Sequence, residues 1–334
     1  MGANVNLLRV LPFSAASLLM LSIGCGSSPS TATTTVPVPT LYVVQNNATT
    51  NVSSVLEFPA TGQGSITPIA ALNAPTGFIF STAAVDDSGN IYVAAYNLDT
   101  PQVSEILEYA SGATGAASPI RTLTLPPVMT PGAIAVDATG QVYVLLYGGN
   151  EINIYAAGAT GNAAPTRQIN GPMALLNDAL SLAVDSAQNI YVANNYGSNV
   201  LVFSSTENGS VLPTRVIVGN ATGLFLWPSG ITVDAVGDIF TTSDSLATQV
   251  LLEFAPGANG NVAPIRSLDL PSAQLFLGVA GDATGNLYTV IENPSTSVPS
   301  ILVYSPNASG ITAPTATITS TAWTASHYGQ IAIH

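Results

Sequence analysis

The chain has 334 residues, with 5 Lys and Arg against 18 Asp and Glu, so its formal net charge at pH 7 is −13. This balance argues against nucleic-acid binding, because neutralising phosphates requires clustered Lys and Arg, and it leaves no basic patch for an anionic membrane surface. The 47% hydrophobic content excludes an intrinsically disordered chain, and the single cysteine excludes an internal disulfide framework.

Residues 1–24 are predicted to be an export signal. Arg9 precedes an apolar stretch that is too short for a membrane-spanning helix. This stretch ends in LSIGC (residues 21–25), which resembles the lipobox of bacterial lipoproteins, in which the cysteine becomes the lipidated first residue. Ser22 departs from that pattern, which most often has leucine at this position. The resemblance implies lipid attachment at Cys25, and the alternative is an ordinary cleaved signal with an incidental cysteine.

Residues 25–40 contain no charge and are mainly Ser, Thr and Pro. Such a segment buries too little apolar surface to offset the entropy of ordering, so we predict a tether. A tether after a lipid anchor would hold the next domain clear of a membrane. We therefore expect an exported protein of the cell envelope, lipid-anchored at the bacterial outer membrane or cell surface.

One repeating unit accounts for residues 41–334. A short apolar strand ending in aspartate recurs at intervals of 48 to 51 residues, and a turn and a second strand such as GNIYV (89–93) follow it. A third strand ends on an aromatic residue, as in ILEY (106–109), and a Gly-rich loop leads into a Pro-x-Arg strand, as in ASGATGAASPIR (110–121). Four short strands per unit, with turn signals between them, predict the blade of a β-propeller. The aspartates are Asp86, Asp137, Asp185, Asp234 and Asp282.

The two ends of the repeat region together make one more blade. Residues 41–70 match the second, third and fourth strands, and GQIAIH (329–334) matches the first, with His334 in the place of the aspartate. The prediction is an all-β, six-bladed β-propeller of four-stranded blades, whose first blade is closed by the C-terminal strand. Closing the ring removes the sheet edges that would otherwise invite aggregation.

The pattern P-x-G-I-A-V-D-x-x-G-x-I-Y-V, best seen at residues 131–144 and 228–241, resembles the repeat of NHL propellers. The segment IYVANNYGSNVLVF (190–203) also resembles the YVTN-type propeller repeat. The resemblance covers residues 41–334 and implies the fold. It leaves the function open, because propellers host binding modules, lyases, lactonases and scaffolds.

The residues that recur once per blade are interpreted as structural. An aspartate at a turn accepts hydrogen bonds from backbone N–H groups, and the glycine that follows it supplies a positive φ. Glu108 and Glu253 are expected to pair with Arg121 and Arg266 on the neighbouring strand. A metal or catalytic role for the aspartates and a ligand-binding arginine cluster are the alternatives. The inner strands offer almost no metal ligands, so no cofactor or metal is predicted.

Function is expected where the sequence stops repeating. These positions are the loops from each outer strand to the next inner strand and the loops between the second and third strands, which share one face of a propeller. Asp178 and His327 occupy equivalent places in the repeat and would serve as a base and its orienting partner, although six-fold geometry puts them on opposite sides. The candidate ligand-binding residues are Phe80, Asn150, Asp178, Asn194, Asn195, Trp227, Phe276 and His327.

These features predict an exported, lipid-anchored binding or scaffold module that holds a protein or carbohydrate through its variable loop face. Nucleic acid is not expected as a partner, and contact with a membrane is expected only through the N-terminal lipid. The alternative function is a lactonase-like hydrolase or lyase with a site at the channel mouth. No nucleophile elbow, P-loop, zinc spacing or EF-hand loop is found in the sequence, so enzymatic activity is less favoured and no catalytic residue is assigned.

Overall fold

The computed structural model describes residues 38–47, 52–97, 99, 102–127, 129–148, 150–244, 249–271, 275–293, 298–323 and 328–334. These residues belong to one compact unit, Val38–His334. The predicted export signal and lipid-attachment residue Cys25, and most of the predicted tether, lie outside them. No helix among the described residues is long and apolar enough to cross a membrane.

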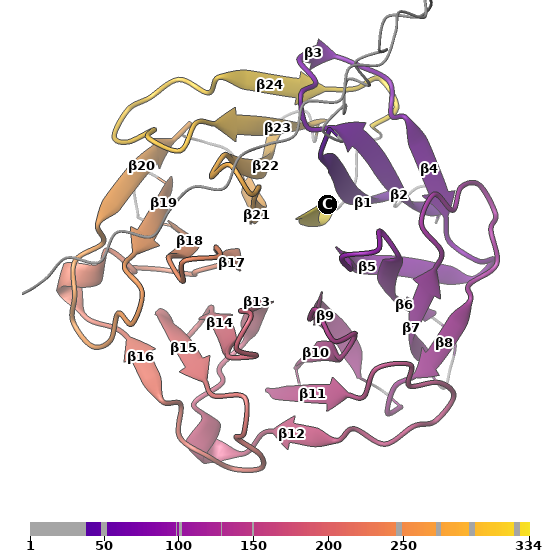
Figure 1. Cartoon of the computed structure of the whole chain (residues 1–334), viewed down its shortest axis with the longest axis horizontal. Helices are drawn as coiled ribbons and strands as arrows, with labels where there is room; N and C mark the ends of the chain where they lie inside the picture. The colour runs from indigo at the N-terminus through magenta and orange to yellow at the C-terminus, as the bar shows by residue number, and fades with distance from the viewer. Residues whose placement is uncertain are drawn as a thin grey trace, which may run out of the picture. The chain divides into compact units, whose positions relative to one another are not determined.

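The described strands form six sheets arranged in a ring, each with four antiparallel strands, which confirms the predicted six-bladed propeller (Figure 1). Each sheet is a blade that runs from an inner strand near the axis to an outer strand at the rim. Blade 1 contains β25 (Tyr328–Ile333), β1 (Thr40–Asn47), β2 (Val52–Pro59) and β4 (Ala70–Asn73). Blade 2 contains β5 (Phe78–Val85), β6 (Ile91–Asn97), β7 (Ser104–Tyr109) and β8 (Arg121–Thr124).

The other four blades follow in chain order. Blade 3 contains β9 (Thr130–Val136), β10 (Val142–Tyr147), β11 (Glu151–Tyr155) and β12 (Arg167–Ile169). Blade 4 contains β13 (Ala179–Val184), β14 (Ile190–Asn194), β15 (Asn199–Phe203) and β16 (Arg215–Ile217). Blade 5 contains β17 (Ile231–Val233), β18 (Ile239–Asp244), β19 (Gln249–Phe254) and β20 (Arg266–Leu270). Blade 6 contains β21 (Leu275–Gly281), β22 (Leu287–Asn293), β23 (Val298–Tyr304) and β24 (Ala316–Thr319), joined by β3 (Gly64–Ser65). Short 3-10 turns, η1 (Pro172–Ala174) and η2 (Asn220–Thr222), precede blades 4 and 5.

The C-terminal strand closes blade 1, as the sequence predicted. Strand β25 pairs antiparallel with β1, with Ile333 opposite Leu41. Beyond this pairing, the backbone N–H of Thr40 donates to the carbonyl of His334 at 2.6 Å, and the His334 N–H donates back at 3.0 Å. The two ends of the repeat region are therefore joined by main-chain hydrogen bonds in the middle of the ring.

A second connection closes the ring at the rim, and the sequence analysis did not predict it. At each blade boundary, a glycine in the loop after the third strand forms a parallel bridge with the outer strand of the preceding blade. Each of these glycines has a positive φ, which glycine adopts at little cost. The loops cover the outer strands, which would otherwise be exposed edges. The bridges are Leu72 to Gly115, Leu123 to Gly161, Ile169 to Gly209, Ile217 to Gly260, Leu268 to Gly310 and Ile318 to Gly64.

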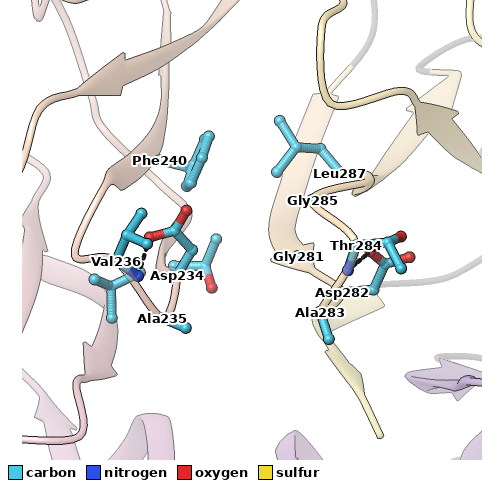
Figure 2. A pocket seen from close by; sticks show the side chains of 12 residues that line it. Asp234, Ala235, Val236, Phe240, Gly281, Asp282, Ala283, Thr284, Gly285 and Leu287 are labelled. Carbon is cyan, nitrogen blue, oxygen red and sulfur yellow. Dashed lines mark hydrogen bonds between the residues drawn. The ribbon is translucent and has the colours of Figure 1, made fainter. Parts of the chain in front are cut away.

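The repeated aspartates are bound within their own turns. The Oδ1 of Asp137 accepts the backbone N–H groups of Thr139 at 2.9 Å and Gln141 at 3.0 Å, and its Oδ2 accepts the Tyr143 hydroxyl at 2.9 Å. Figure 2 shows two further turns, those of Asp234 and Asp282, each folded back on its own backbone. The structure therefore accounts for these carboxylates as turn formers between the first and second strands.

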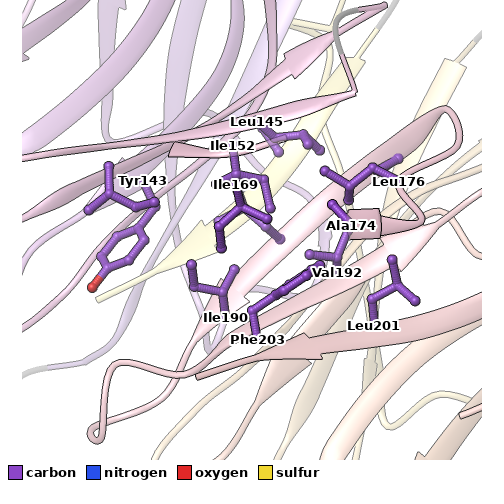
Figure 3. Close-up of a cluster of buried hydrophobic side chains, with 14 residues drawn as sticks. Tyr143, Leu145, Ile152, Ile169, Ala174, Leu176, Ile190, Val192, Leu201 and Phe203 are labelled. Atoms are coloured by element: carbon purple, nitrogen blue, oxygen red, sulfur yellow. The ribbon is translucent and has the colours of Figure 1, made fainter. Parts of the chain in front are cut away.

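The hydrophobic core lies between the blades. In Figure 3, Tyr143, Leu145 and Ile152 of blade 3 face Ile190, Val192 and Phe203 of blade 4, and all are at most 1% exposed. Each sheet is covered on both faces by its neighbours, so the middle strands are buried along their length rather than at alternate residues. This two-sided burial explains why these strands are nearly continuous apolar runs in the sequence.

The inner strands of blades 5, 6 and 1 come close to one another four residues before the aspartate position of each repeat. A Cβ added to Gly230 would lie 3.1 Å from the Cα of Gly278, and one added to Gly278 would lie 3.1 Å from the Cα of Gln330. From this layer the Gln330 side chain crosses the axis, and its Nε2 donates to the carbonyl of Leu180 in blade 4 at 3.0 Å. The channel is therefore bridged by a side chain at this level.

Replacing Gly278 with alanine should lower the free energy of unfolding by about 2 kcal/mol, because the new methyl group would force two inner-strand backbones apart. Chemical denaturation of the variant tests this expectation. Gly132→Ala is the matched control in another inner strand, since its Cβ would lie 3.4 Å or more from every neighbouring atom, which is ordinary van der Waals contact. An equal loss of stability in both variants would contradict the proposed backbone contact.

Candidate functional site

The face that carries the aspartate turns offers pockets whose acidic groups already have partners. One pocket of about 420 Å³ lies between blades 5 and 6, lined by Asp234, Phe240, Asp282 and Leu287 among others (Figure 2). Asp234 Oδ1 accepts hydrogen bonds from three backbone N–H groups of its own turn. The Asp282 carboxylate accepts hydrogen bonds from Thr284, Asn286 and Tyr288. Within the described residues, no group of three or more His, Cys, Asp or Glu is placed to hold a metal ion.

At the turn of Asp137, the pKa values of the carboxyl group and of the Tyr143 phenol are both shifted away from neutral pH. Burial alone would raise the pKa of Asp137, but hydrogen bonds from Thr139, Gln141 and Tyr143 outweigh it and hold this pKa below its usual value. Burial and the hydrogen bond to Asp137 raise the pKa of Tyr143. An acid that stays ionised beside a phenol that stays protonated suits a structural role better than proton transfer at pH 7.

The opposite face carries the loops that do not repeat, and the structure links several predicted residues there. Asn150 lies in the loop between β10 and β11, and its Oδ1 accepts the backbone N–H of Asp178 at 3.0 Å. Asn195, after β14, is buried, and its Nδ2 donates to the carbonyl of Pro228 at 3.3 Å. Side-chain hydrogen bonds therefore join the loops of blades 3, 4 and 5 to one another.

Two of the predicted ligand-binding side chains support this face from inside rather than lining it. Asn194 is fully buried, where its Oδ1 accepts the Asn177 N–H at 2.7 Å and its Nδ2 donates to the Leu175 carbonyl at 3.0 Å. Phe80 is also fully buried, in the core between blades 1 and 2, because β5 begins at Phe78 and includes it. Asn194 positions the loop that contains Leu175, and Phe80 packs the core.

Among the remaining candidates, the described part of the structure includes the side chains of Trp227, Asn150 and Asp178. Trp227 is 48% exposed, Asn150 is exposed and Asp178 is half-buried. Phe276 lies on β21, and its side chain is outside the described part of the structure, as is His327 entirely. The structure therefore brings Asn150 and Asp178 together, and the pairing of Asp178 with His327 stays a prediction.

Large exposed apolar residues lie in the loops of blades 3 to 5 and at the end of β10, and we call this set the apolar loop strip. Apart from Trp227, its members are not among the ligand-binding residues predicted from the sequence. Departure from the repeat was the one signal that pointed to these loops. The strip consists of Tyr147, Met173, Leu175, Tyr196, Phe225 and Trp227, which are 46% to 63% exposed.

Backbone strain is concentrated in the same loops. Among the described non-glycine residues, six have a positive φ, a region that L-residues other than Asn and Asp rarely adopt. One of these is Gln188, in an aspartate turn. The other five lie in the variable loops of blades 3 to 5, and two of them, Leu175 and Trp227, belong to the apolar loop strip. Because Asn and Asp adopt this region more readily, the strain lies at Leu175, Ser198 and Trp227. Strained conformations persist where the surroundings hold them, and they cluster at functional sites. The five are Asn150, Leu175, Asp178, Ser198 and Trp227.

Comparison with known proteins shows the fold and nothing finer. No family model matches the chain, and no curated protein matches it. Among solved structures, a protein of unknown function from Bacteroides caccae is similar with a TM-score of 0.60 at 9% identity, over 88% of this chain and 98% of that one. The COPII outer coat vertex on membranes is similar with a TM-score of 0.56 at 14% identity, over 82% and 71%. The WD40 β-propeller domain of Doa1 has a TM-score of 0.50 at 12% identity, over 74% of each chain.

Proposed function

We propose that this protein is an exported, lipid-anchored propeller that binds a protein partner through the apolar loop strip. The observation that carries the proposal is the coincidence of two features in one group of loops. Large apolar side chains are exposed there, and the backbone is held in strained conformations that present Leu175 and Trp227. Exposed apolar patches and maintained strain are each associated with binding surfaces.

A protein partner fits the composition of the strip better than a carbohydrate does. Protein interfaces are enriched in aromatic residues and methionine, and the strip combines both with a leucine. A carbohydrate remains the second ligand class, because Trp227 and the exposed amide of Asn150 provide a stacking surface and a hydrogen-bonding group. Lipid attachment at Cys25 and the tether would place this surface outside the membrane.

The rigidity of the loops supports binding without large rearrangement. Asn150 accepts a hydrogen bond from the Asp178 N–H and Asn195 donates one to the Pro228 carbonyl, which fixes the loops of three successive blades relative to one another. Asn194 accepts a hydrogen bond from the Asn177 N–H and holds the loop before blade 4. A surface that is ordered before binding loses little conformational entropy on association, so more of the contact energy appears as affinity.

The test is to select ligands for the full chain from a displayed peptide library and from a glycan array, and to measure Kd for each ligand with variant proteins. Trp227→Asn removes the ring, and asparagine tolerates the positive φ of this position. Phe225→Ala removes a second exposed ring. For a peptide bound by the strip, each variant should raise Kd at least about tenfold, the effect expected of a central aromatic anchor.

The control variants are Ile120→Ala and Ile265→Ala, which remove exposed apolar side chains at the start of the outer strands of blades 2 and 5. Their Kd values should stay within about twofold of the parent chain, because surface substitutions outside an interface have small effects. Ligands whose affinity falls in the control variants and not in the strip variants would contradict the proposal. If only glycans are selected, the ligand of the strip is a carbohydrate and not a protein.

A further inference from the structure

Four blades contain an arginine at the start of the outer strand, and its guanidinium contacts neighbouring groups in a recurring way. In blade 2, Arg121 pairs with Glu108 through two hydrogen bonds, from its Nε at 2.5 Å and from its Nη2. In blade 5, the Nε of Arg266 pairs with Glu253. The Nη1 atoms of Arg167, Arg215 and Arg266 donate to carbonyls of the following blade, those of Glu207, Ala258 and Ala308, at 3.1 to 3.2 Å.

An aromatic ring completes the surroundings of these guanidinium groups. The Arg215 guanidinium carbon lies 5.5 Å from the centre of the Tyr191 ring, and that of Arg266 lies 5.8 Å from the centre of Phe240. The strand register places the three groups in one row, with Phe240 opposite Glu253 and Glu253 opposite Arg266. All three kinds of group meet at Arg266, whose guanidinium contacts the Glu253 carboxylate, the Phe240 ring and the Ala308 carbonyl.

Blade 1 contains the same row without its cation. Tyr42 lies opposite Glu57, and Glu57 lies opposite Ala70, which stands where blades 2 and 5 have arginine. Glu57 is 7% exposed, and its Oε1 is fully buried with no hydrogen-bond partner among the described residues. Burial raises the pKa of this carboxyl group, and burial followed by the charge of Glu57 raises the pKa of Tyr42 to about 12.

Blade 6 also has no arginine at this position, and it has no carboxylate opposite it either. There Val303 lies opposite Ala316, so both the carboxylate and the cation are replaced by apolar residues. That arrangement leaves no charge to satisfy. A buried carboxylate kept without its partner is costly, because the desolvation of the charge is not offset. Glu57 therefore presents a buried acceptor oxygen at the position where blades 2 and 5 have an arginine beside the carboxylate.

We propose that Glu57 is the anionic group of a guanidinium-binding site at the boundary of blades 1 and 2. Its ligand is the guanidinium of a small molecule or of an arginine side chain on another protein. Tyr42 provides the ring face. The carbonyl of Ala113 provides the acceptor, because Ala113 precedes its bridging glycine, Gly115, by two residues, as Ala258 precedes Gly260. The site is independent of the apolar loop strip, since it lies near the other end of the strands.

A planar, forked cation suits this set of groups better than a metal ion does. One carboxylate and one carbonyl leave a metal short of ligands, whereas a guanidinium uses its parallel N–H groups on the carboxylate and its face on the ring. The chain itself binds guanidinium groups with the same residue types in blades 2 and 5.

The test follows thermal unfolding of the full chain with methylguanidine and, at matched concentrations, with methylurea, a neutral analogue of the same shape. Methylguanidine should raise the unfolding midpoint by about 2 °C more than methylurea near saturation. Glu57→Gln should abolish this difference. Glu253→Gln, which alters a carboxylate already paired with Arg266, should retain it.

Ala70→Arg is the decisive variant, because it adds the side chain that blades 2 and 5 already have. It should raise the unfolding midpoint by about 2 °C and remove the response to methylguanidine, since the site is then filled from within. Calorimetric titration with acetyl-Gly-Arg-Gly-amide separates the two sources of the cation. Tenfold tighter binding than methylguanidine would identify an arginine of another protein, and equal binding would identify a small molecule.

Three results would overturn the proposal. The first is a parent chain that responds equally to methylguanidine and methylurea. The second is a response of unchanged size in Ala70→Arg. The third is an Ala70→Arg variant whose unfolding midpoint falls, since this would show that the space beside Glu57 does not accept a guanidinium.

Discussion

Deleting residues 328–334 should abolish the single cooperative unfolding transition of the propeller and leave a chain that aggregates. These residues include the whole inner strand of blade 1, and the deletion removes its ladder with β1. It also removes Ile331 from a core cluster that contains Leu41, Phe58 and Trp323. The loss of one buried isoleucine costs about 2 to 5 kcal/mol, and the backbone pairing adds to this, so most of the stability of an ordinary domain is consumed. Calorimetry and size-exclusion chromatography measure the outcome.

Moving the deleted strand provides the matched control. The ends of β25 and β1 are joined by hydrogen bonds between Thr40 and His334, and the two strands are antiparallel. Residues 328–334 placed before Thr40 and joined to it by a two-residue Asn-Gly turn would therefore form the same ladder as a hairpin. Recovery of the cooperative transition would show that the strand itself closes the ring. A deletion variant that keeps the parent midpoint would contradict the role given to β25.

The features that the sequence predicted well are those that recur in every blade. The strand order, the aspartate turns and the closure by residues 329–334 each depend on several copies of one local pattern, so errors at one copy are corrected by the others. His334 could be assigned to the inner strand of blade 1 because it stands where the other blades have aspartate. The pairing of Arg121 with Glu108 and of Arg266 with Glu253 followed from the same alignment and is confirmed.

The features that were missed depend on contacts between blades or on a single residue. The bridge from Gly115 to Leu72 joins a loop to the preceding blade, and the local sequence shows only a Gly-rich loop. The bond from Gln330 to Leu180 crosses the axis and occurs once. Phe80 was taken as a loop residue, whereas its backbone N–H donates to Ser53 Oγ at 3.0 Å and its ring enters the core. The direction of a side chain near a strand end depends on where the strand begins, and the repeat does not determine this.

Replacing Asp137 with alanine should lower the free energy of unfolding by about 3 kcal/mol at pH 7. Its carboxylate, besides closing its own turn, accepts the side-chain amide of Gln188 from blade 4 at 2.9 Å and so links two blades. The variant would also remove the carboxylate to which the fully buried Tyr143 hydroxyl donates. A hydrogen bond to a charged group contributes about 1.5 to 3 kcal/mol, and an unsatisfied buried hydroxyl adds a further cost. Chemical denaturation measures the loss, with the exposed Asp87→Ala as the control that should change by less than about 0.5 kcal/mol.

The pH dependence of the same variant gives a second, independent test. The pKa of Asp137 is lowered in the folded protein, because hydrogen bonds outweigh the effect of burial. Its contribution to stability is therefore fully present above the pKa of an unfolded aspartate, about 3.9, and is lost as the pH falls through the lower folded value. The parent chain should lose more stability between pH 5 and strongly acid conditions than Asp137→Ala does. Asp137→Asn should share this weaker acid sensitivity and lose less stability at pH 7, because its amide oxygen still accepts the N–H groups of Thr139 and Gln141. Parallel pH profiles for all three proteins would show that the carboxylate charge contributes nothing to the stability of the turn.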